Sequence, residues 1–343
     1  MYCGFFNLGE EPFNMKPDPR FLFLSQEHRE RLAGLAYGVL NRKNCLVMTG
    51  DIGTGKTTLI TAVMRYLPRD RTRFSTISVP TLSSRELLEM VMRNFGMEEI
   101  PASKAERIHR LAEFLREGEA SGIAAALIID EAHKLTPDVL EEVRMLGNLH
   151  ALGLILVGQN ELNDLLNRPE LRALRQRICV RLTIGPLGKD EVEPYIRWRW
   201  KAAGGGPSAP FSAEAIGAVT QWSGGVPRLI NSICDNPLTV AFEAGEHSVT
   251  AEHVQAAVAR LKLVVPPVGV QGAGLRLSAA AGAGQPVATA EAAPAESKPR
   301  WTLESVRTRI ASQLPHRQTQ GGNGRHGDTH ARNPVKPPRQ PQS

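Results

Sequence analysis

The feature that most constrains this chain is the stretch of residues 50–57, where glycine, lysine and threonine recur at fixed spacing. It matches the pattern G-x-x-x-x-G-K-[ST] at every fixed position. The matching residues, with the threonine that follows them, are Gly50, Asp51, Ile52, Gly53, Thr54, Gly55, Lys56, Thr57 and Thr58. The apolar run 45–49 before the pattern predicts a buried strand, and residues 58–66 after it predict a helix. The pattern therefore lies between a strand and a helix, as it must in order to form a phosphate loop.

A loop of this kind binds phosphate for simple physical reasons. Its glycines let backbone N–H groups turn inward around phosphate oxygens, and the helix N-terminus adds favourable partial charge. Lys56 would reach the β- and γ-phosphates, and the Thr57 hydroxyl would ligate Mg²⁺. We therefore expect ATP and Mg²⁺ as cofactors, because a chance glycine turn would not need the flanking strand and helix.

A second chemical signal is the acid pair Asp130-Glu131, which ends the apolar strand predicted at 124–130. Such a pair is often only a solvated turn. In a chain with a phosphate loop, we expect Asp130 to hold Mg²⁺ and Glu131 to orient and deprotonate the attacking water. His133 completes Asp-Glu-Ala-His, and both a tuning role and a passive surface position stay open for it.

Three further polar positions follow predicted strands or open a helix. Gln159, with Asn160 as the alternate, ends a strand beside the phosphate site and suits a γ-phosphate sensor. The arginine-dense stretch 168–177 precedes the last strand, where an arginine can reach the ATP of a neighbouring subunit. Arg228 follows a glycine turn at a helix start and is expected to fold back over the phosphates; a solvated cap is the alternative.

The order of predicted elements gives the fold class. Five predicted strands, interrupted by helices, indicate a three-layer α/β unit with a parallel sheet. Ser83–Glu86 and Ser103–Glu106 are both expected to form capping boxes at helix starts. Beyond residue 188 only helices are predicted. We expect a turn-rich lead-in (1–40), a nucleotide-binding domain (41–187), a helical lid (188–264) and a largely disordered tail (265–343).

The net charge of +6 is concentrated in the tail. Residues 265–343 hold ten lysines and arginines and only four acids, so the rest of the chain is neutral overall. This argues against a core that binds nucleic acid in general, and leaves DNA binding through the tail open. Within the tail, Leu303, Val306, Ile310 and Leu314 are spaced for one helical face, either as a docking segment or as a helix without a role.

The cysteines and the apolar runs bear on location. Cys3, Cys45, Cys179 and Cys234 are far apart and form no metal spacing, and we expect Cys45 and Cys179 to be small core residues of strands. No stretch has the features of a signal peptide or the length of a membrane span. These observations predict a cytoplasmic protein, with peripheral attachment at the inner membrane as the alternative.

With these residues in hand, the chain resembles the AAA+ ATPases, and within them the general secretion pathway protein A (ExeA-type) family. The resemblance covers residues 1–262. The segments that carry it share family-specific motifs: Phe5-Phe6 to Pro12-Phe13, Pro17–Leu22, Gly50–Thr58, Leu127–Ala132, Leu156–Gln159, Arg168–Arg172, Gln176–Ile178 and Gly224–Asn231.

The resemblance implies a sheet of order 5-1-4-3-2 with a C-terminal helical lid, and ATP between them. It implies that Gln159 and Arg228 are the two sensors. It makes Arg177, or else Arg172, the arginine finger of a homo-oligomer. In that family ATP turnover is coupled to assembly of cell-envelope machinery: type II secretion, pilus or exopolysaccharide export.

The chain also departs from the family. Relatives usually have Gln where His133 stands, and many carry a membrane span and a peptidoglycan-binding domain after the lid. The main hypothesis is thus an Mg²⁺-dependent ATPase that drives or switches envelope assembly through a protein partner. The alternative hypotheses are a DNA-associated transposition or initiator-type ATPase, and an ATP-dependent scaffold with negligible turnover.

Overall fold

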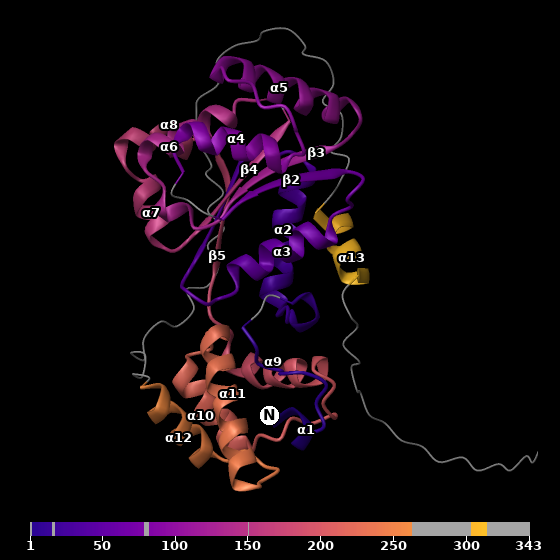
Figure 1. Ribbon diagram of the computed structural model, residues 1–343, viewed down its shortest axis with the longest axis vertical. Coiled ribbons are helices and arrows are strands. Elements are labelled where there is room, and N and C mark those ends of the chain that lie inside the picture. Colours follow the sequence, from indigo (N-terminus) through magenta and orange to yellow (C-terminus); the bar gives the residue numbers. More distant parts are fainter. Residues whose placement is uncertain (1, 16–17, 79–81, 150, 263–302, 314–343) are drawn as a thin grey trace, which may run out of the picture.

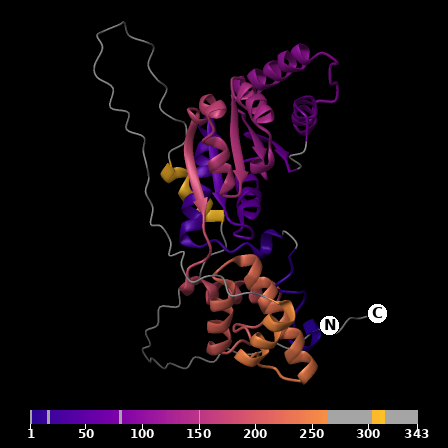
Figure 2. The same ribbon diagram turned by 90° about the vertical axis from the view of Figure 1, so that its left-hand side faces the viewer.

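The computed structural model describes residues 2–15, 18–78, 82–149, 151–262 and 303–313. Figure 1 shows an α/β part built on one twisted sheet, with a smaller helical part below it. Figure 2, turned by 90°, shows the same division, with the strands running toward the helical part. The structure thus has an α/β part and a helical part.

The sheet is parallel throughout, with the order β2-β3-β4-β1-β5. Read from the other edge this is 5-1-4-3-2, so the expected order is confirmed. Its strands are β1 (Cys45–Gly50), β2 (Thr72–Ile77), β3 (Ala124–Ile129), β4 (Leu152–Gly158) and β5 (Ile178–Ile184). Every residue of β1, β3 and β4 is buried, because helices cover both faces of the central strands.

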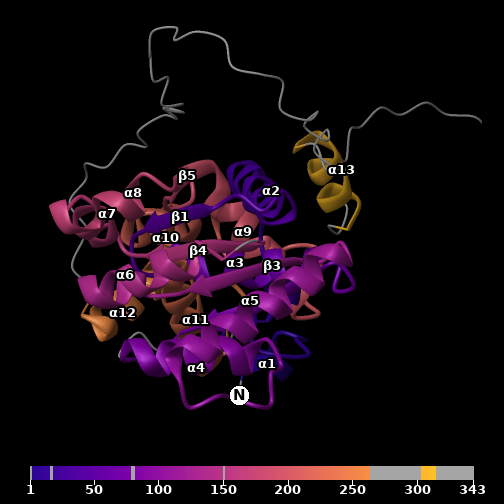
Figure 3. The same ribbon diagram turned by 90° about the horizontal axis from the view of Figure 1, so that it is seen from above.

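Two groups of helices cover the sheet, as the view from above in Figure 3 shows. One face packs against α2 (Gln26–Leu40) and α3 (Lys56–Tyr66). The other face packs against α4 (Ser84–Asn94), α5 (Lys104–Ala120), α6 (Pro137–Leu146), α7 (Glu161–Leu166) and α8 (Arg172–Arg175). One-turn 3-10 helices, η2 (Ala132–Lys134) and η3 (Pro169–Leu171), connect the elements near the strand ends.

The two expected capping boxes differ. Ser83 and Glu86 form the reciprocal bonds of a capping box at the start of α4. At the start of α5, Ser103 makes no side-chain cap bond, so that expectation was wrong. Spacing alone does not fix the rotamer that a cap needs.

The helical lid consists of α9 (Lys189–Ala202), α10 (Ala213–Ser223), α11 (Pro227–Ala244) and α12 (Ala251–Leu261). Its apolar core also takes in the start of the chain, where the short helix α1 (Tyr2–Phe5) lies within the lead-in that we expected to be turn-rich. The Tyr2 hydroxyl donates to Asp235, and the Phe5 ring stacks on His247 with centroids 4.1 Å apart. The first residues of the chain therefore pack as part of the lid.

The tail returns to the α/β part through α13 (Leu303–Gln313). Val306 and Ile310 are buried there in one cluster with side chains of α2, and Figures 1 and 3 show the two helices side by side. The helix predicted from spacing is therefore present, and it docks on its own chain. The expected disorder elsewhere in 265–343 falls on residues outside those described.

The structure also shows where the strand cysteines lie and how apolar the described helices are. Cys45 is buried in β1, but Cys179 is exposed on β5, so its assignment to the core was wrong. The reason is that β5 is an edge strand, where alternate side chains face away from the covering helices. Among the described helices, none combines the length and the hydropathy needed to cross a bilayer.

Candidate nucleotide site

The phosphate loop follows β1 directly and ends where α3 begins. Gly53 and Gly55 have φ of 82° and 99°, left-handed values that favour glycine. Gly50 is needed for a different reason, because a Cβ there would lie 2.2 Å from the Ile184 carbonyl oxygen of the neighbouring strand. The loop thus has the backbone that turns N–H groups inward, at the N-terminus of a helix.

Lys56 is a buried cation at the phosphate loop, with 7% of its surface exposed. Its Nζ donates to the carbonyl oxygens of Gly50 (2.7 Å) and Asp51 (2.8 Å). Burial lowers the pKa of Lys56, while Glu131 and Asp130 oppose that shift. An anion in the adjoining pocket would relieve the same desolvation penalty, so the site favours a negatively charged ligand.

Thr57 and Asp130 meet at the edge of the pocket. The Thr57 hydroxyl donates to Asp130 Oδ2 over 2.8 Å, and Asp130 Oδ1 accepts the backbone N–H of Glu131 over 2.9 Å. Asp130 itself is buried. The structure thus brings together, from α3 and the end of β3, the two side chains that were predicted to hold the metal.

These two oxygen donors fit Mg²⁺. Mg²⁺ in nucleotide sites keeps several waters and takes only one or two protein oxygens besides the phosphates. A hydroxyl and a carboxylate already in contact provide that donor set. Among the described residues, no cluster of three or more His, Cys, Asp or Glu is arranged for an all-protein metal site.

Glu131 lies just past β3 and lines the pocket. Its backbone has φ 54°, a left-handed value that is uncommon for a residue with a side chain. Lys134 Nζ lies 2.8 Å from Glu131 Oε2, and this hydrogen bond is the largest factor that lowers the pKa of Glu131. Glu131 is therefore ionised at neutral pH, as a proton acceptor must be.

The end of β4 contributes Gln159 and Asn160. Gln159 lines the pocket, and its backbone N–H donates to His133 Nδ1 over 3.2 Å. The Asn160 side chain instead donates to Asp51 Oδ1 over 2.6 Å. Of the two candidates for the sensor, the structure gives Gln159 the position on the pocket and Asn160 the role of a brace for the phosphate loop.

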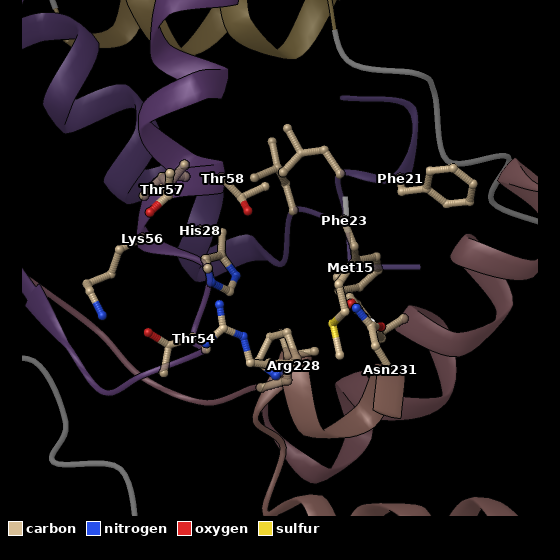
Figure 4. Close-up of a pocket in the computed structure, with 18 of the residues that line it drawn as sticks. Met15, Phe21, Phe23, His28, Thr54, Lys56, Thr57, Thr58, Arg228 and Asn231 are labelled. Atoms are coloured by element: carbon tan, nitrogen blue, oxygen red, sulfur yellow. Dashed lines mark hydrogen bonds between the residues drawn. The ribbon is translucent and has the colours of Figure 1, made fainter. Parts of the chain in front are cut away.

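Arg228 connects the lid to the loop. It lines the pocket at the start of α11, and its backbone N–H donates to the Gly53 carbonyl oxygen over 3.2 Å. Figure 4 shows its side chain extending toward the space below Lys56 and Thr57. A Cβ on Gly53 would lie 2.7 Å from Arg228 Cβ, so this glycine also permits the close approach of the lid.

Arg177 and Arg172 are placed away from this pocket. Arg177 contacts the Asn148 side chain, and Arg172 is exposed on α8. Neither residue lines the cavity that the loop and acid pair share. Within one chain they therefore do not reach the phosphate loop, which leaves the arginine-finger assignment as a prediction about a neighbouring subunit.

The pocket has a wall that the motifs did not indicate. The cavity of about 510 Å³ lies between the loop, the lead-in and the lid. Its additional lining side chains include Asn14, Met15, Asp18, Phe21, Leu22, Phe23, Leu24, His28, Leu187, Tyr195, Arg199 and Asn231. Figure 4 shows His28, Met15 and Asn231 facing the same space from different parts of the chain. The segment 17–22 was a signal in the sequence, although only the fold shows that Asp18, Phe21 and Leu22 line the pocket.

The chain is similar in sequence to known proteins. The family model of the AAA domain matches residues 40–166. General secretion pathway protein A of Aeromonas hydrophila is 37% identical over 258 residues, which make up 73% of this chain and 46% of that protein. The chain thus spans about half the length of this curated relative.

Solved structures share the fold at lower identity. Drosophila ORC bound to DNA gives a TM-score of 0.59 at 21% identity, over 74% of this chain and 65% of that chain. Cdc6p from Pyrobaculum aerophilum gives a TM-score of 0.55 at 20% identity, over 73% and 70%. At these identities the likeness concerns the fold, and it supports the arrangement of parallel sheet and helical lid.

Proposed function

The chain belongs to the AAA+ proteins of the general secretion pathway protein A family, and on this premise we propose that it hydrolyses ATP with Mg²⁺. The observation that carries the proposal is the Thr57–Asp130 hydrogen bond of 2.8 Å. It joins the phosphate loop to the acid pair at the edge of a pocket that Glu131 and Lys56 also line.

In the proposed reaction, water attacks the γ-phosphate and Glu131 accepts a proton from that water. Lys56 exchanges its contacts with the Gly50 and Asp51 carbonyls for β- and γ-phosphate oxygens. Thr57 and Asp130 would hold Mg²⁺, which when bound neutralises charge on the phosphates. Glu131 must also leave its ion pair with Lys134. In the described conformation the carboxylate is therefore paired with Lys134 and not yet free to accept a proton from water.

Gln159 and Arg228 are proposed to detect the nucleotide. Gln159 follows the last residue of β4, beside the loop, where its amide can bind the γ-phosphate and position water. Arg228 belongs to the lid, yet its backbone bonds to Gly53 of the loop. A charge change at the phosphates would therefore act on the angle between the lid and the α/β part.

We expect Arg177, with Arg172 as second choice, to complete the site of a neighbouring subunit in a homo-oligomer. A guanidinium can stabilise transition-state charge from outside the chain that binds the nucleotide. Arg177→Ala should leave ATP affinity nearly unchanged and lower turnover roughly a hundredfold or more. Arg175→Ala, at the last residue of α8 and two positions before Arg177, is the matched control. Mass in solution with and without ATP tests the oligomer directly.

For the cellular role, we propose switching or driving the assembly of cell-envelope machinery through a protein partner: type II secretion, a pilus or exopolysaccharide export. The support is the kinship with general secretion pathway protein A over most of this chain. The proposed location is the cytoplasm or the inner face of the inner membrane, because ATP is available there. Pull-down from cells with the ATP-trapped Glu131→Gln protein, compared with Lys56→Ala, would identify a partner that needs bound nucleotide.

The base assignment is tested by Glu131→Gln. Turnover, measured as phosphate release, should fall about a hundredfold or more because the amide cannot accept the proton. ATP affinity should stay within about threefold, since no phosphate contact is lost. Glu141→Gln, on the exposed face of α6, is the control. Normal hydrolysis by Glu131→Gln would show that another group is the base, and no turnover in the wild type would favour the scaffold hypothesis.

The phosphate assignment is tested by Lys56→Ala. Removal of the ammonium should weaken ATP binding at least tenfold or so, because a charge-assisted contact to phosphate is lost. Fluorescent ATP analogues in a titration measure this affinity. Lys134→Ala is the control, because Lys134 contacts Glu131 but does not line the pocket. Equal affinity in Lys56→Ala and the wild type would contradict the assignment.

The alternative proposal is a DNA-associated, initiator- or transposition-type role, favoured by the basic tail. Five cations after residue 314 can be neutralised while the sequence of α13 stays unchanged: Arg317, Arg325, Arg332, Lys336 and Arg339. Their change to Gln should weaken duplex binding and lower its salt dependence if the tail contacts phosphates. Duplex binding that is absent in the wild type at low salt would remove this alternative.

A further inference from the structure

His133 occupies a position that the proposed mechanism does not use. It lies in η2, two residues after Glu131, and only 10% of its side chain is exposed. By contrast, the next residue, Lys134, is 54% exposed. The His133 side chain is therefore largely buried beside the site, and it is not the surface histidine that its position in a turn would allow.

One ring nitrogen of His133 is bound to the strand that carries the sensor. The Gln159 backbone N–H donates to His133 Nδ1 over 3.2 Å. Gly158 makes this approach possible, because a Cβ on it would lie 3.2 Å from both the backbone nitrogen and Nδ1 of His133. The turn after β3 is thus seated against the carboxyl end of β4.

The other ring nitrogen faces the base. Since Nδ1 accepts a hydrogen bond, the proton of the neutral ring must be on Nε2. His133 Nε2 lies 3.7 Å from Glu131 Oε2. This distance is longer than a hydrogen bond, but a small rotation of the carboxylate away from Lys134 would close it. The ring therefore presents an N–H group to Glu131 on the side opposite to its bond with Gln159.

We propose that His133 is a positioning residue that links Gln159 to Glu131, so that the sensor strand and the base move together. The inference rests on the proposed function, because it assigns Glu131 as base and Gln159 as sensor. A displacement of Gln159 on binding the γ-phosphate shifts the imidazole, and the Nε2–H then guides the carboxylate from Lys134 toward the water. His133 exchanges no proton with substrate in this scheme.

The link itself can be tested without turnover. In ¹⁵N spectra of the full-length protein at neutral pH, the His133 ring should be the neutral Nε2–H tautomer. Its signals are assigned by their loss in His133→Asn. Either the Nδ1–H tautomer or a charged ring would overturn the proposal, because neither can accept the Gln159 N–H.

Its effect on turnover is tested with variants that imitate one nitrogen at a time. The amide oxygen of Asn lies near the position of Nδ1, and the amide of Gln reaches the position of Nε2. His133→Leu keeps the volume of the ring without either contact. We expect His133→Leu and His133→Ala to lower kcat roughly tenfold or more, with ATP affinity within about twofold, because about one kcal/mol is lost per hydrogen bond.

His133→Asn and His133→Gln should each regain part of kcat, at least about threefold over His133→Leu. If the kcat of His133→Leu equals that of the wild type, the ring acts only by filling space and the proposal is overturned. The same conclusion follows if neither His133→Asn nor His133→Gln has a higher kcat than His133→Leu. A wild type without any turnover would instead refute the proposed ATPase. In that case the tautomer measurement still decides whether the link between Gln159 and His133 exists.

Discussion

At the scale of single residues, Glu131 shows how a turn holds a carboxylate at the pocket. The left-handed backbone at this residue costs about 1 kcal/mol or more and persists only where neighbours fix it. Asp130 Oδ1 holds the Glu131 N–H, and the Lys134 N–H bonds to the Glu131 carbonyl oxygen. These bonds place the carboxylate at the mouth of the pocket with its charge matched by Lys134.

His28 gives a pH prediction at this scale. Burial lowers its pKa, Arg31 adds to that shift, and Glu27 and Glu191 oppose it. Between the lowered value and the ordinary 6.5, the unfolded chain binds more protons than the folded one, so the free energy of unfolding rises with pH. The wild type should therefore lose stability relative to His28→Gln as pH falls from 7 to 5.

Urea unfolding at several pH values measures this difference. His109→Gln is the control, because the His109 side chain on α5 is 68% exposed. Its stability should follow the wild type across the same range. Parallel curves for His28→Gln and the wild type would contradict a buried, neutral His28.

The residues of the site differ in how far the sequence could predict them. Lys56, Thr57 and the acid pair belong to contiguous patterns whose chemistry fixes both spacing and role. His28, Tyr195 and Asn231 could not be found in this way, because they meet only when segments about 160 to 200 positions apart fold together. The local periodicity of a sequence carries no information about contacts between segments so far apart.

At the scale of elements, the lead-in joins the lid through Arg199 of α9. This buried guanidinium donates to the carbonyl oxygens of Pro12 (2.6 Å) and Asn14 (2.8 Å), and it lies 4.7 Å above the Phe21 ring. Arg199 of one lid helix thereby holds the lead-in at Pro12 and Asn14 and again at Phe21. Movement of the lid would carry this wall of the nucleotide pocket with it.

Arg199→Met should weaken ATP binding about tenfold and destabilise the fold by roughly 2–4 kcal/mol. The loss of stability follows because one buried and one partly buried carbonyl group lose their donor. The weaker affinity follows because the pocket wall is no longer held in place. Nucleotide titration and urea unfolding measure the two effects, with Arg197→Met on the exposed side of α9 as control. An Arg199→Met protein that binds ATP as the wild type does would show that the lead-in needs no such anchor.

The strands that the sequence predicted most readily are those whose apolar composition matches their burial in the fold. The apolar runs of β1, β3 and β4 lie in a sheet covered on both faces, so their composition and environment coincide. The lead-in was harder, because its aromatic residues serve the lid core some 200 positions away. Its prolines exclude a long helix, yet they do not indicate the short α1 or what it packs against.

At the scale of the whole molecule, three distant segments enclose one cavity: the phosphate loop, the lead-in and the lid. Helix α2 belongs to this arrangement through two contacts. Its first turn carries His28 on the pocket, and its apolar face receives α13 from the tail. The tail is thus connected physically to an element of the nucleotide site, although spacing alone could predict only that α13 is a helix.

The docking of α13 should be reversible, because it depends on few side chains. Burial of Val306 and Ile310 contributes roughly 3–6 kcal/mol in total, and ordering the segment offsets part of that. A helix of this length is also marginal on its own in water. The double variant Val306→Asp and Ile310→Asp should therefore release α13 while the α/β part stays folded.

Release is measured by two signals: faster trypsin cleavage after Arg307, and faster amide hydrogen exchange in α2. Thr308→Asp with Ser312→Asp adds the same charge to the exposed face of α13 and serves as the control. It should leave both signals close to those of the wild type. If the two double variants were cleaved and exchanged at equal rates, the apolar seat on α2 would not be what holds the helix. If exchange in the first turn of α2 rises as well, the tail acts on the His28 wall of the pocket from outside the nucleotide site.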